Sequence, residues 1–284
     1  MSAPGVNGDT PLCVAIGEYN IGWHDPDLSL DRAATIIAES AANGARLVIL
    51  PEMCTSGFTM DSEKFAEPPA SEHVTRLSEM ARFSSVWLIA GVPTRDTDAA
   101  DSAARNSALV FSPSGALVSV YHKQRLFTYA NEQLSYRPGD QSVVIDIEGI
   151  RVSPFICYDL RFPELFRRVA SRTDLIVVIA SWPSQRRSHW DVLLRARAIE
   201  NQCYVIGVNR TGDGGSIAYD GGSAAYDPSG EVLKQRLGPR AEGVATVVVA
   251  AGEVDRVRAA YPFLADAGCP SDLSAMRPEP IGTP

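Results

Sequence analysis

Short apolar runs rich in β-branched residues alternate with segments of helical periodicity along nearly the whole chain. In 28–42 the apolar residues recur at helical spacing and stop at Asn43-Gly44, a common helix stop signal. Residues 47–50 and 175–180 are unbroken apolar runs, as in strands buried on both faces. This alternation predicts an α/β fold. We expect strands at 14–17, 47–50, 86–92, 143–147, 150–156, 175–180, 204–208 and 244–249, and helices at 28–42, 72–83, 163–170 and 189–200.

Turn residues add two hairpins and set the limits of the domain. One hairpin spans 107–120 and turns at 113–115, and the other turns at 227–230, both on Pro-Ser-Gly. No linker-like stretch interrupts the patterned part of the chain, so we expect a single domain at 11–265. The flanking segments, 1–10 and the Pro-rich 266–284, are expected to be flexible tails.

Composition argues against several classes of protein. The 284 residues include 26 Lys and Arg against 34 Asp and Glu, a net charge of −8, and no basic cluster suited to nucleic acid or an anionic membrane. No apolar run is long enough to span a bilayer, and the N-terminus lacks signal-peptide features. The five cysteines are scattered without CxxC pairs, so we expect neither a complete disulfide framework nor a metal site. We therefore expect a cytoplasmic protein.

Two charged residues stand directly after predicted strands. Glu52 follows the apolar run 47–50 and Pro51, at the carboxyl end where open α/β sheets place their sites. Lys123 follows the second strand of the first hairpin. Each has a plain alternative, a solvated side chain in a loop, and neither segment alone decides between the two interpretations.

Cys157 ends the predicted strand 150–156 and precedes a sharp turn into a helix. At such a turn a side chain can be exposed and backbone N–H groups point at a substrate, although a cysteine in an apolar strand is by default a core residue. A thiol that attacks an acyl carbon needs a base, an oxyanion donor and a proton donor, which Glu, Lys and Cys can supply together. Histidine is the usual partner, but His122 and His189 fit structural roles better.

Three segments together resemble the nitrilase superfamily of carbon–nitrogen hydrolases. They are LPE at 50–52, YHK at 121–123 and ICYDLRFPEL at 156–165. The likeness continues through Ser181-Trp182-Pro183 and Asn209-Arg210 to the turn at 227–230, and so covers about 11–265. Each motif is modest alone, and their order and spacing make the resemblance specific.

The resemblance implies a four-layer αββα sandwich that dimerises through helices near the active site and works without a metal or organic cofactor. At the matching positions Cys157 is the nucleophile, Glu52 the general base and Lys123 the cation that stabilises the oxyanion. The N–H of Tyr158 is a second oxyanion donor, and Glu132 is expected to orient Lys123 and the substrate. We expect the lysine and the helix start to favour the thiolate form of Cys157.

Within the superfamily, the chain most resembles the omega-amidase branch, which hydrolyses small linear amides of 2-oxo acids, such as 2-oxoglutaramate, to the carboxylate and ammonia. Arg186 is the candidate clamp for the substrate carboxylate, and a solvated loop arginine is the alternative. Candidate pocket walls, for which aromatic core packing is the alternative, are Phe58, Phe127, Tyr129 and Trp182.

Two other interpretations remain open. A deaminated glutathione amidase fits 156–165 and 189–202 nearly as well. From another class, a catalytically inactive interaction module would keep the fold, and the complete set of Glu52, Lys123, Glu132 and Cys157 argues against it. Cys54, two residues from Glu52, is expected to be a packing residue without chemistry.

Overall fold

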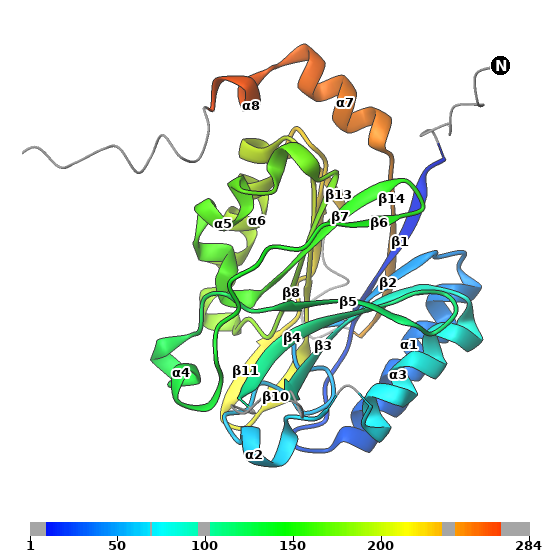
Figure 1. Ribbon diagram of the computed structural model, residues 1–284, viewed down its shortest axis with the longest axis vertical. Helices are drawn as coiled ribbons and strands as arrows, with labels where there is room; N and C mark the ends of the chain where they lie inside the picture. Colours follow the sequence, from blue (N-terminus) through cyan, green and yellow to red (C-terminus); the bar gives the residue numbers. More distant parts are fainter. Residues whose placement is uncertain (1–9, 69, 96–102, 235–241, 268–284) are drawn as a thin grey trace, which may run out of the picture.

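The computed structural model describes residues 10–68, 70–95, 103–234 and 242–267. They form a single domain, a four-layer αββα sandwich in which two six-stranded sheets pack face to face between two pairs of helices (Figure 1). The predicted tails lie almost entirely outside the described residues. None of the helices in the described ranges has the length and apolarity needed to cross a bilayer.

The first sheet carries the N-terminal half of the domain. Its strands are β1 (Leu12–Glu18), β2 (Leu47–Ile49), β3 (Trp87–Arg95), β4 (Ala104–Phe111), β5 (Leu117–His122) and β14 (Gly243–Val249), in the order β14-β1-β2-β3-β4-β5. β1, β2 and β3 are parallel, joined by crossovers that contain the helices α1 (Pro26–Ala42) and α3 (Glu72–Ser84). Asp25 begins α1 by accepting the N–H of Leu28, and Gly44 follows its end at φ +82°, as the sequence predicts.

The second sheet repeats this arrangement with the C-terminal half. Its strands are β6 (Ile145–Ile147), β7 (Ile150–Ile156), β8 (Leu175–Ala180), β9 (Tyr204–Asn209), β12 (Ala224–Tyr226) and β13 (Val232–Lys234), in the order β13-β12-β9-β8-β7-β6. β7, β8 and β9 are parallel, with α5 (Pro163–Arg167) and α6 (Arg187–Asn201) in the crossovers. Every residue of β8 is buried, which explains its unbroken apolar sequence.

The main hydrophobic core lies between the two sheets. Val14 and Ile49 from the first sheet and Phe155 and Val177 from the second belong to one cluster of fully buried side chains. A second cluster fills the space between the first sheet and the helices α1 and α3. Packing two sheets and their helices through continuous apolar layers fixes the strand ends relative to one another.

The carboxyl ends of β2, β5, β7, β8 and β9 gather at one end of the sandwich. β5 runs in the same direction as β2 and β3, because both β3 with β4 and β4 with β5 are antiparallel. Residues that follow these strands are therefore brought together from both halves of the chain, and hydrogen bonds from Ser181 and Lys123 to Glu52 join them directly.

Three parts of the fold differ from the sequence prediction. The helix expected at 163–170 ends at Arg167, and a separate 3-10 turn follows at Ala170–Arg172. The strand 244–249 was expected to close the folded part, but α7 (Ala251–Ala260) and α8 (Phe263–Asp266) follow it. α7 buries only Val254 and Val257, so its apolar pattern is too sparse to be recognised as a helix from sequence.

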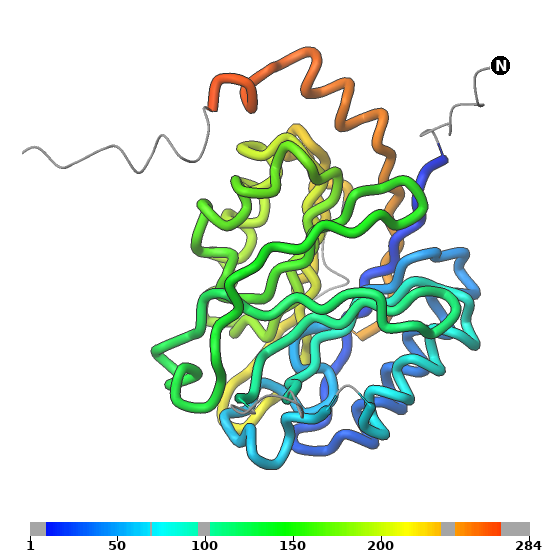
Figure 2. Tube along the Cα trace, viewed as in Figure 1, coloured from blue at the N-terminus to red at the C-terminus, as the bar shows by residue number. Residues whose placement is uncertain are grey.

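The third difference is a two-stranded hairpin outside both sheets, β10 (Thr211–Gly214) and β11 (Ile217–Asp220). Its sequence, TGDGGSIAYD, has four turn-forming residues among its first five and too little alternation to predict strands. The chain trace in Figure 2 places this yellow hairpin near α2 (Ser62–Phe65), at the opposite end of the molecule from α7.

Candidate active site

A cavity of about 350 Å³ opens at the end of the sandwich where the strand ends gather. Cys157 and Lys123 both line it, and Tyr158 lies beside them. All five residues expected to bind substrate lie in its wall, namely Phe58, Phe127, Tyr129, Trp182 and Arg186. Tyr129 is 85% exposed and therefore forms the rim, whereas Trp182 is 3% exposed and forms a buried wall.

Glu52 lies in a tight turn after β2 and is completely buried. The turn presses against β3 at Gly91, where a Cβ would come within 2.6 Å of the Glu52 Cα, so glycine is required. Ser181, at the end of β8, donates its N–H to Oε2 of Glu52 at 2.8 Å. The carboxylate is therefore held by the strand ends of both sheets, and its position depends on the whole sandwich.

Lys123 follows β5, and its side chain is buried between two carboxylates. Its Nζ lies 2.9 Å from Oε1 of Glu52 and 2.9 Å from Oε2 of Glu132. Burial opposes the charge, but Glu132 and Glu52 outweigh it and raise the pKa of the Lys123 ammonium well above its ordinary value. Because an ammonium has three N–H groups, two can donate to the carboxylates while the third can donate to an oxygen atom of a ligand in the cavity.

Asn106 on β4 joins the two glutamates and was not identified from the sequence. Its Nδ2 donates to Oε1 of Glu52 at 2.8 Å and to Oε1 of Glu132 at 2.9 Å. Asn106 lies between Arg105 and Ser107 in β4, so nothing in the sequence indicated that its amide is fully buried. Glu132 also accepts the N–H of Phe127 at 2.6 Å, so one carboxylate anchors the segment that carries the aromatic wall.

Cys157 begins a one-turn 3-10 helix, Cys157–Arg161, with a φ of +46°. A positive φ at a non-glycine residue costs conformational energy and turns this side chain out of the strand and into the cavity. The thiol is partly exposed there. Because the first N–H groups of a helix have no intrahelical acceptor, the N–H of Tyr158 is not used by the turn itself.

The groups around Cys157 act on the pKa of its thiol in opposite directions. Burial raises the pKa of the thiol well above its ordinary value, and the Glu52 and Glu132 carboxylates raise it further. Lys123 lowers it, as expected, but two carboxylates and one ammonium give the buried cluster a net charge of −1. Burial and the two carboxylates thus act against the thiolate form in the unliganded site, while Lys123 acts in its favour.

Asp159 connects the nucleophile turn to the lysine segment. Its Oδ2 accepts the Tyr121 hydroxyl at 2.8 Å and the Ile156 N–H at 3.1 Å, and Oδ1 accepts the Arg125 N–H at 2.8 Å. Burial raises its pKa to about 6 despite these donors. The sequence marked Asp159 only as part of a motif, and the structure places it as a brace between Lys123 and Cys157.

Two arginines lie at the cavity rim, one of which the sequence analysis missed. Arg186, half-buried, lies 5.5 Å from the ring centre of Phe127. Arg161 stacks 4.7 Å from the ring centre of Trp182 and donates to Nδ1 of His189 at 3.3 Å. Within the described residues neither guanidinium forms an ion pair. Both are thus positioned by aromatic faces and keep donors for a ligand.

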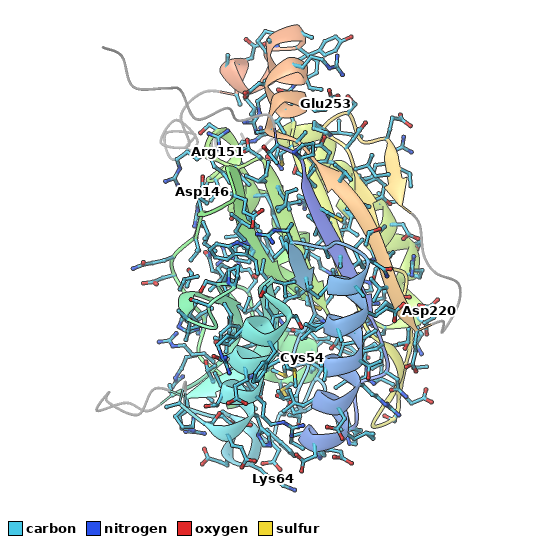
Figure 3. The ribbon with its side chains drawn as sticks, turned by 90° about the vertical axis from the view of Figure 1, so that its right-hand side faces the viewer. Cys54, Lys64, Asp146, Arg151, Asp220 and Glu253 are labelled. Carbon is cyan, nitrogen blue, oxygen red and sulfur yellow. The ribbon has the colours of Figure 1, made fainter. Side chains whose placement is uncertain are left out.

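Cys54 lies apart from this cavity. In the view of Figure 3, which looks onto α1 and α3, it is seen between these helices, and it belongs to the core cluster beneath them. It is completely buried, and burial raises the pKa of its thiol to about 12. The other described cysteines, Cys13, Cys157 and Cys203, are also free thiols, and Cys269 lies outside the described residues.

Known proteins resemble this chain over most of its length. Residues 13–259 match the carbon–nitrogen hydrolase family. The chain is 40% identical over 191 residues to omega-amidase YafV of Escherichia coli strain K12, which covers 67% of this chain and 72% of that protein. It is 30% identical over 252 residues to the 2-oxoglutaramate amidase of Bacillus subtilis strain 168, which covers 88% of this chain and 95% of that protein.

A solved structure of similar shape extends the comparison to the fold. It is that of a CN-hydrolase superfamily protein from Xanthomonas campestris with an arsenic adduct in its active site, and it matches with a TM-score of 0.84 and 34% identity. The match covers 92% of this chain and 98% of that one. With the family match spanning nearly all of the described sandwich, this chain belongs to the carbon–nitrogen hydrolase family.

Proposed function

We propose that the protein is an omega-amidase that hydrolyses the terminal amide of a 2-oxo dicarboxylic acid, such as 2-oxoglutaramate, to the dicarboxylate and ammonia. The observation that carries the proposal is a small cavity with a thiol and an ammonium at its inner end and, at its rim, two arginines that form no ion pair with another described residue. A linear substrate with an amide at one end and a carboxylate at the other matches this polarity. The two amidase relatives described above support the same substrate class.

In the proposed mechanism, Glu52 takes the thiol proton as the sulfur of Cys157 attacks the amide carbon. The carbonyl oxygen becomes an oxyanion that accepts hydrogen bonds from Lys123 Nζ and the Tyr158 N–H. Glu52 has three donors on its two oxygens, from Asn106, Lys123 and the backbone of Ser181, which leaves acceptor capacity for the proton.

The tetrahedral intermediate then collapses. Glu52 returns the proton to the nitrogen, the C–N bond breaks, ammonia leaves, and the acyl group remains on Cys157 as a thioester. A water gives its proton to Glu52 and attacks the thioester carbon, and the second intermediate releases the carboxylate and restores the thiol. Glu132 keeps Lys123 directed at the reacting oxygen throughout, because its carboxylate contacts Nζ and the Phe127 N–H together.

Arg186 is proposed to bind the distant carboxylate of the substrate, while the aromatic side chains of Phe58, Phe127, Tyr129 and Trp182 enclose its carbon chain. The neighbouring Arg187 cannot share this role, because its guanidinium is bound to Asp191 at 2.9 Å. A bidentate guanidinium–carboxylate contact would fix the chain so that its amide reaches Cys157.

The test is a measurement of kcat/KM for ammonia release from 2-oxoglutaramate, with propionamide as an amide that lacks the carboxylate. We expect 2-oxoglutaramate to be the better substrate by about 100-fold, the factor given by one charged hydrogen-bonded contact of ~3 kcal/mol. Turnover of deaminated glutathione without ammonia release from 2-oxoglutaramate would replace this proposal with the deaminated glutathione amidase. Absence of turnover and of Cys157 alkylation by iodoacetamide would favour an inactive interaction module.

We further infer a cytoplasmic homodimer that associates through α6. Val192 and Ile199 on this helix are 66% and 47% exposed and lie two turns apart on one face of it. The free thiols of the described cysteines fit a reducing compartment. Analytical ultracentrifugation tests the association, and we expect Val192→Glu to shift the protein toward the monomer. A wild-type monomer at micromolar concentration would contradict this inference.

A further inference from the structure

Arg210 is one of the largest fully buried side chains of the described residues, and it lies between β9 and the β10–β11 hairpin. Among the described residues, the oxygens that accept its hydrogen bonds are all uncharged. Nε donates to the Thr211 carbonyl at 3.1 Å, and Nη2 donates to the carbonyls of Ile21 at 2.9 Å and Asp213 at 3.0 Å and to Oδ1 of Asn20 at 3.1 Å. Burying a cation among neutral acceptors is costly, so a purely structural reason for it is weak.

These contacts join the hairpin to parts of the chain almost 200 residues away in sequence. Asn20 and Ile21 belong to the connection between β1 and α1, and the N–H of Thr211 donates to the carbonyl of Tyr19 at 3.0 Å. Gly212, at φ +80°, passes so close to the Asn20 side chain that no Cβ fits there. The root of the hairpin is thereby held against the first sheet.

The guanidinium also supports the face of the hairpin that meets the substrate cavity. Its Cζ lies 4.7 Å from the ring centre of Tyr219, and Tyr219 lines the cavity together with Lys123 and Cys157. Ser216, Ile217 and Ala218, the other cavity-lining residues of the hairpin, are exposed and belong to neither large sheet. Their placement therefore depends on the contacts at the hairpin root, on Tyr219 and on one hydrogen bond from Ser184 Oγ to the Ala218 carbonyl at 3.2 Å.

We propose that Arg210 is a positioning residue that holds the β10–β11 hairpin as one wall of the cavity and thereby selects amides whose acyl chain reaches that wall. The inference rests on the proposed function, since the cavity is taken to be the substrate site. A five-carbon 2-oxo amide extends from Cys157 toward the rim, whereas propionamide ends near the thiol. Loosening the wall therefore penalises the long substrate more than the short one.

The test compares Arg210→Lys with the matched control Arg258→Lys. Lysine keeps the charge but lacks the planar guanidinium group, which can donate to several oxygens at once. Arg258 on α7 likewise donates to backbone carbonyls, among them those of Ala170 and Thr173, and does not line the cavity. Both variants thus replace a guanidinium with an ammonium, Arg210→Lys at the hairpin and Arg258→Lys far from it.

For Arg210→Lys we expect kcat/KM for 2-oxoglutaramate, divided by kcat/KM for propionamide, to fall about tenfold. The decrease should come mainly from a higher KM for 2-oxoglutaramate, because a contact that positions the substrate is lost. Hydrogen–deuterium exchange should become faster at 211–220 and remain as in the wild type across both sheets. Arg258→Lys should leave the ratio and the exchange at 211–220 unchanged.

Equal losses on both substrates, or unchanged exchange at 211–220, would overturn the proposal and leave Arg210 as a general stabiliser of the fold. If the wild type releases no ammonia from 2-oxoglutaramate, the proposed function fails, while the exchange experiment still decides whether Arg210 holds the hairpin. A second variant, Tyr219→Leu, removes the ring that contacts Arg210 and keeps the backbone pairing of residue 219 with Gly212 at the hairpin root. It should raise the KM for 2-oxoglutaramate and leave exchange at Thr211 and Gly212 unchanged.

Discussion

The inner end of the cavity and its rim are built by different means. At the inner end, Glu52, Lys123 and Glu132 have no exposed surface, and short hydrogen bonds join each charge to the others or to Asn106. At the rim, two half-buried arginines rest on aromatic rings, Tyr129 is 85% exposed, and a hairpin outside both sheets completes the wall.

This difference follows from what each region has to do. Buried charges keep a fixed geometry, because any displacement leaves an unpaired charge in a medium of low dielectric constant. Making and breaking bonds requires such a fixed geometry. Aromatic and loop contacts cost little to rearrange, so the rim can be adapted to a particular acyl group without disturbing the chemistry. Substitutions at the inner end should therefore act on kcat, and substitutions at the rim on KM.

The largest expected effect is at the nucleophile. Replacing Cys157 with alanine removes the acyl-enzyme route and should lower kcat by about 10⁴-fold or more in an ammonia-release assay. Cys54→Ser is the matched control and should keep its activity, because that thiol lies in a separate core cluster. Equal loss in both variants would mean that folding, and not chemistry, was measured.

Lys123→Met should have the next largest effect. It removes an oxyanion donor and leaves two buried carboxylates without their cation, so we expect kcat to fall by about 10²–10³-fold with a smaller change in KM. Thermal unfolding of the same sample reports the accompanying loss of stability. A variant with near-normal kcat would contradict the assignment of Lys123 to the oxyanion.

At the rim, Arg186→Gln should raise the KM for 2-oxoglutaramate by about 10–100-fold, the range for losing a charged hydrogen bond. Its kcat should change little, because no contact of Arg186 reaches the buried cluster. Propionamide, which has no carboxylate, serves as the internal control for the integrity of the site. A loss of kcat with unchanged KM would place Arg186 at the inner end and erase the distinction between the two regions.

The last prediction concerns stability, not activity, and the carboxyl group of Asp159. Its folded-state pKa of about 6 lies above the ordinary value of 3.8, so the folded protein binds this proton more tightly than the unfolded chain. The contribution of Asp159 to stability is therefore fully present below pH 4 and declines as pH rises toward 6, by about 3 kcal/mol.

Urea unfolding of wild type and Asp159→Asn between pH 4 and 7 measures this contribution. The free energy of unfolding of the wild type relative to the variant should decrease as pH increases across that range. An increase would show that the four donors around the carboxylate outweigh its burial, so that its charge is favoured in the folded state.

Secondary structure was predicted well where the pattern was strong. The helix of α1 with its stop at Gly44, the all-buried β8 and the hairpin of β4 and β5 lie within a few residues of their expected positions. The hairpin of β10 and β11 and the helix α7 were missed, because glycine-rich strands and a helix with two buried residues carry almost no periodic signal.

The residues of the candidate site also fall into those that the sequence indicated and those that it did not. Glu52, Lys123 and Cys157 were recognisable because each follows an apolar strand in a compact motif, and Glu132 was named only through the resemblance to the nitrilase superfamily. Asn106, Arg161 and the hairpin wall were missed, since a lone asparagine in a strand and an arginine within a motif have many structural uses. Their partners come from distant parts of the chain.

The sequence by itself determined the α/β alternation and singled out Cys157, Glu52 and Lys123 as candidate site residues, because these depend on local periodicity and on short motifs. Only the tertiary structure decided the charge balance of the site. Glu52, Glu132 and Lys123 meet at buried positions, and burial together with the two carboxylates raises the pKa of the Cys157 thiol while Lys123 lowers it. No spacing along the chain encodes that outcome, because it depends on which side chains are buried together.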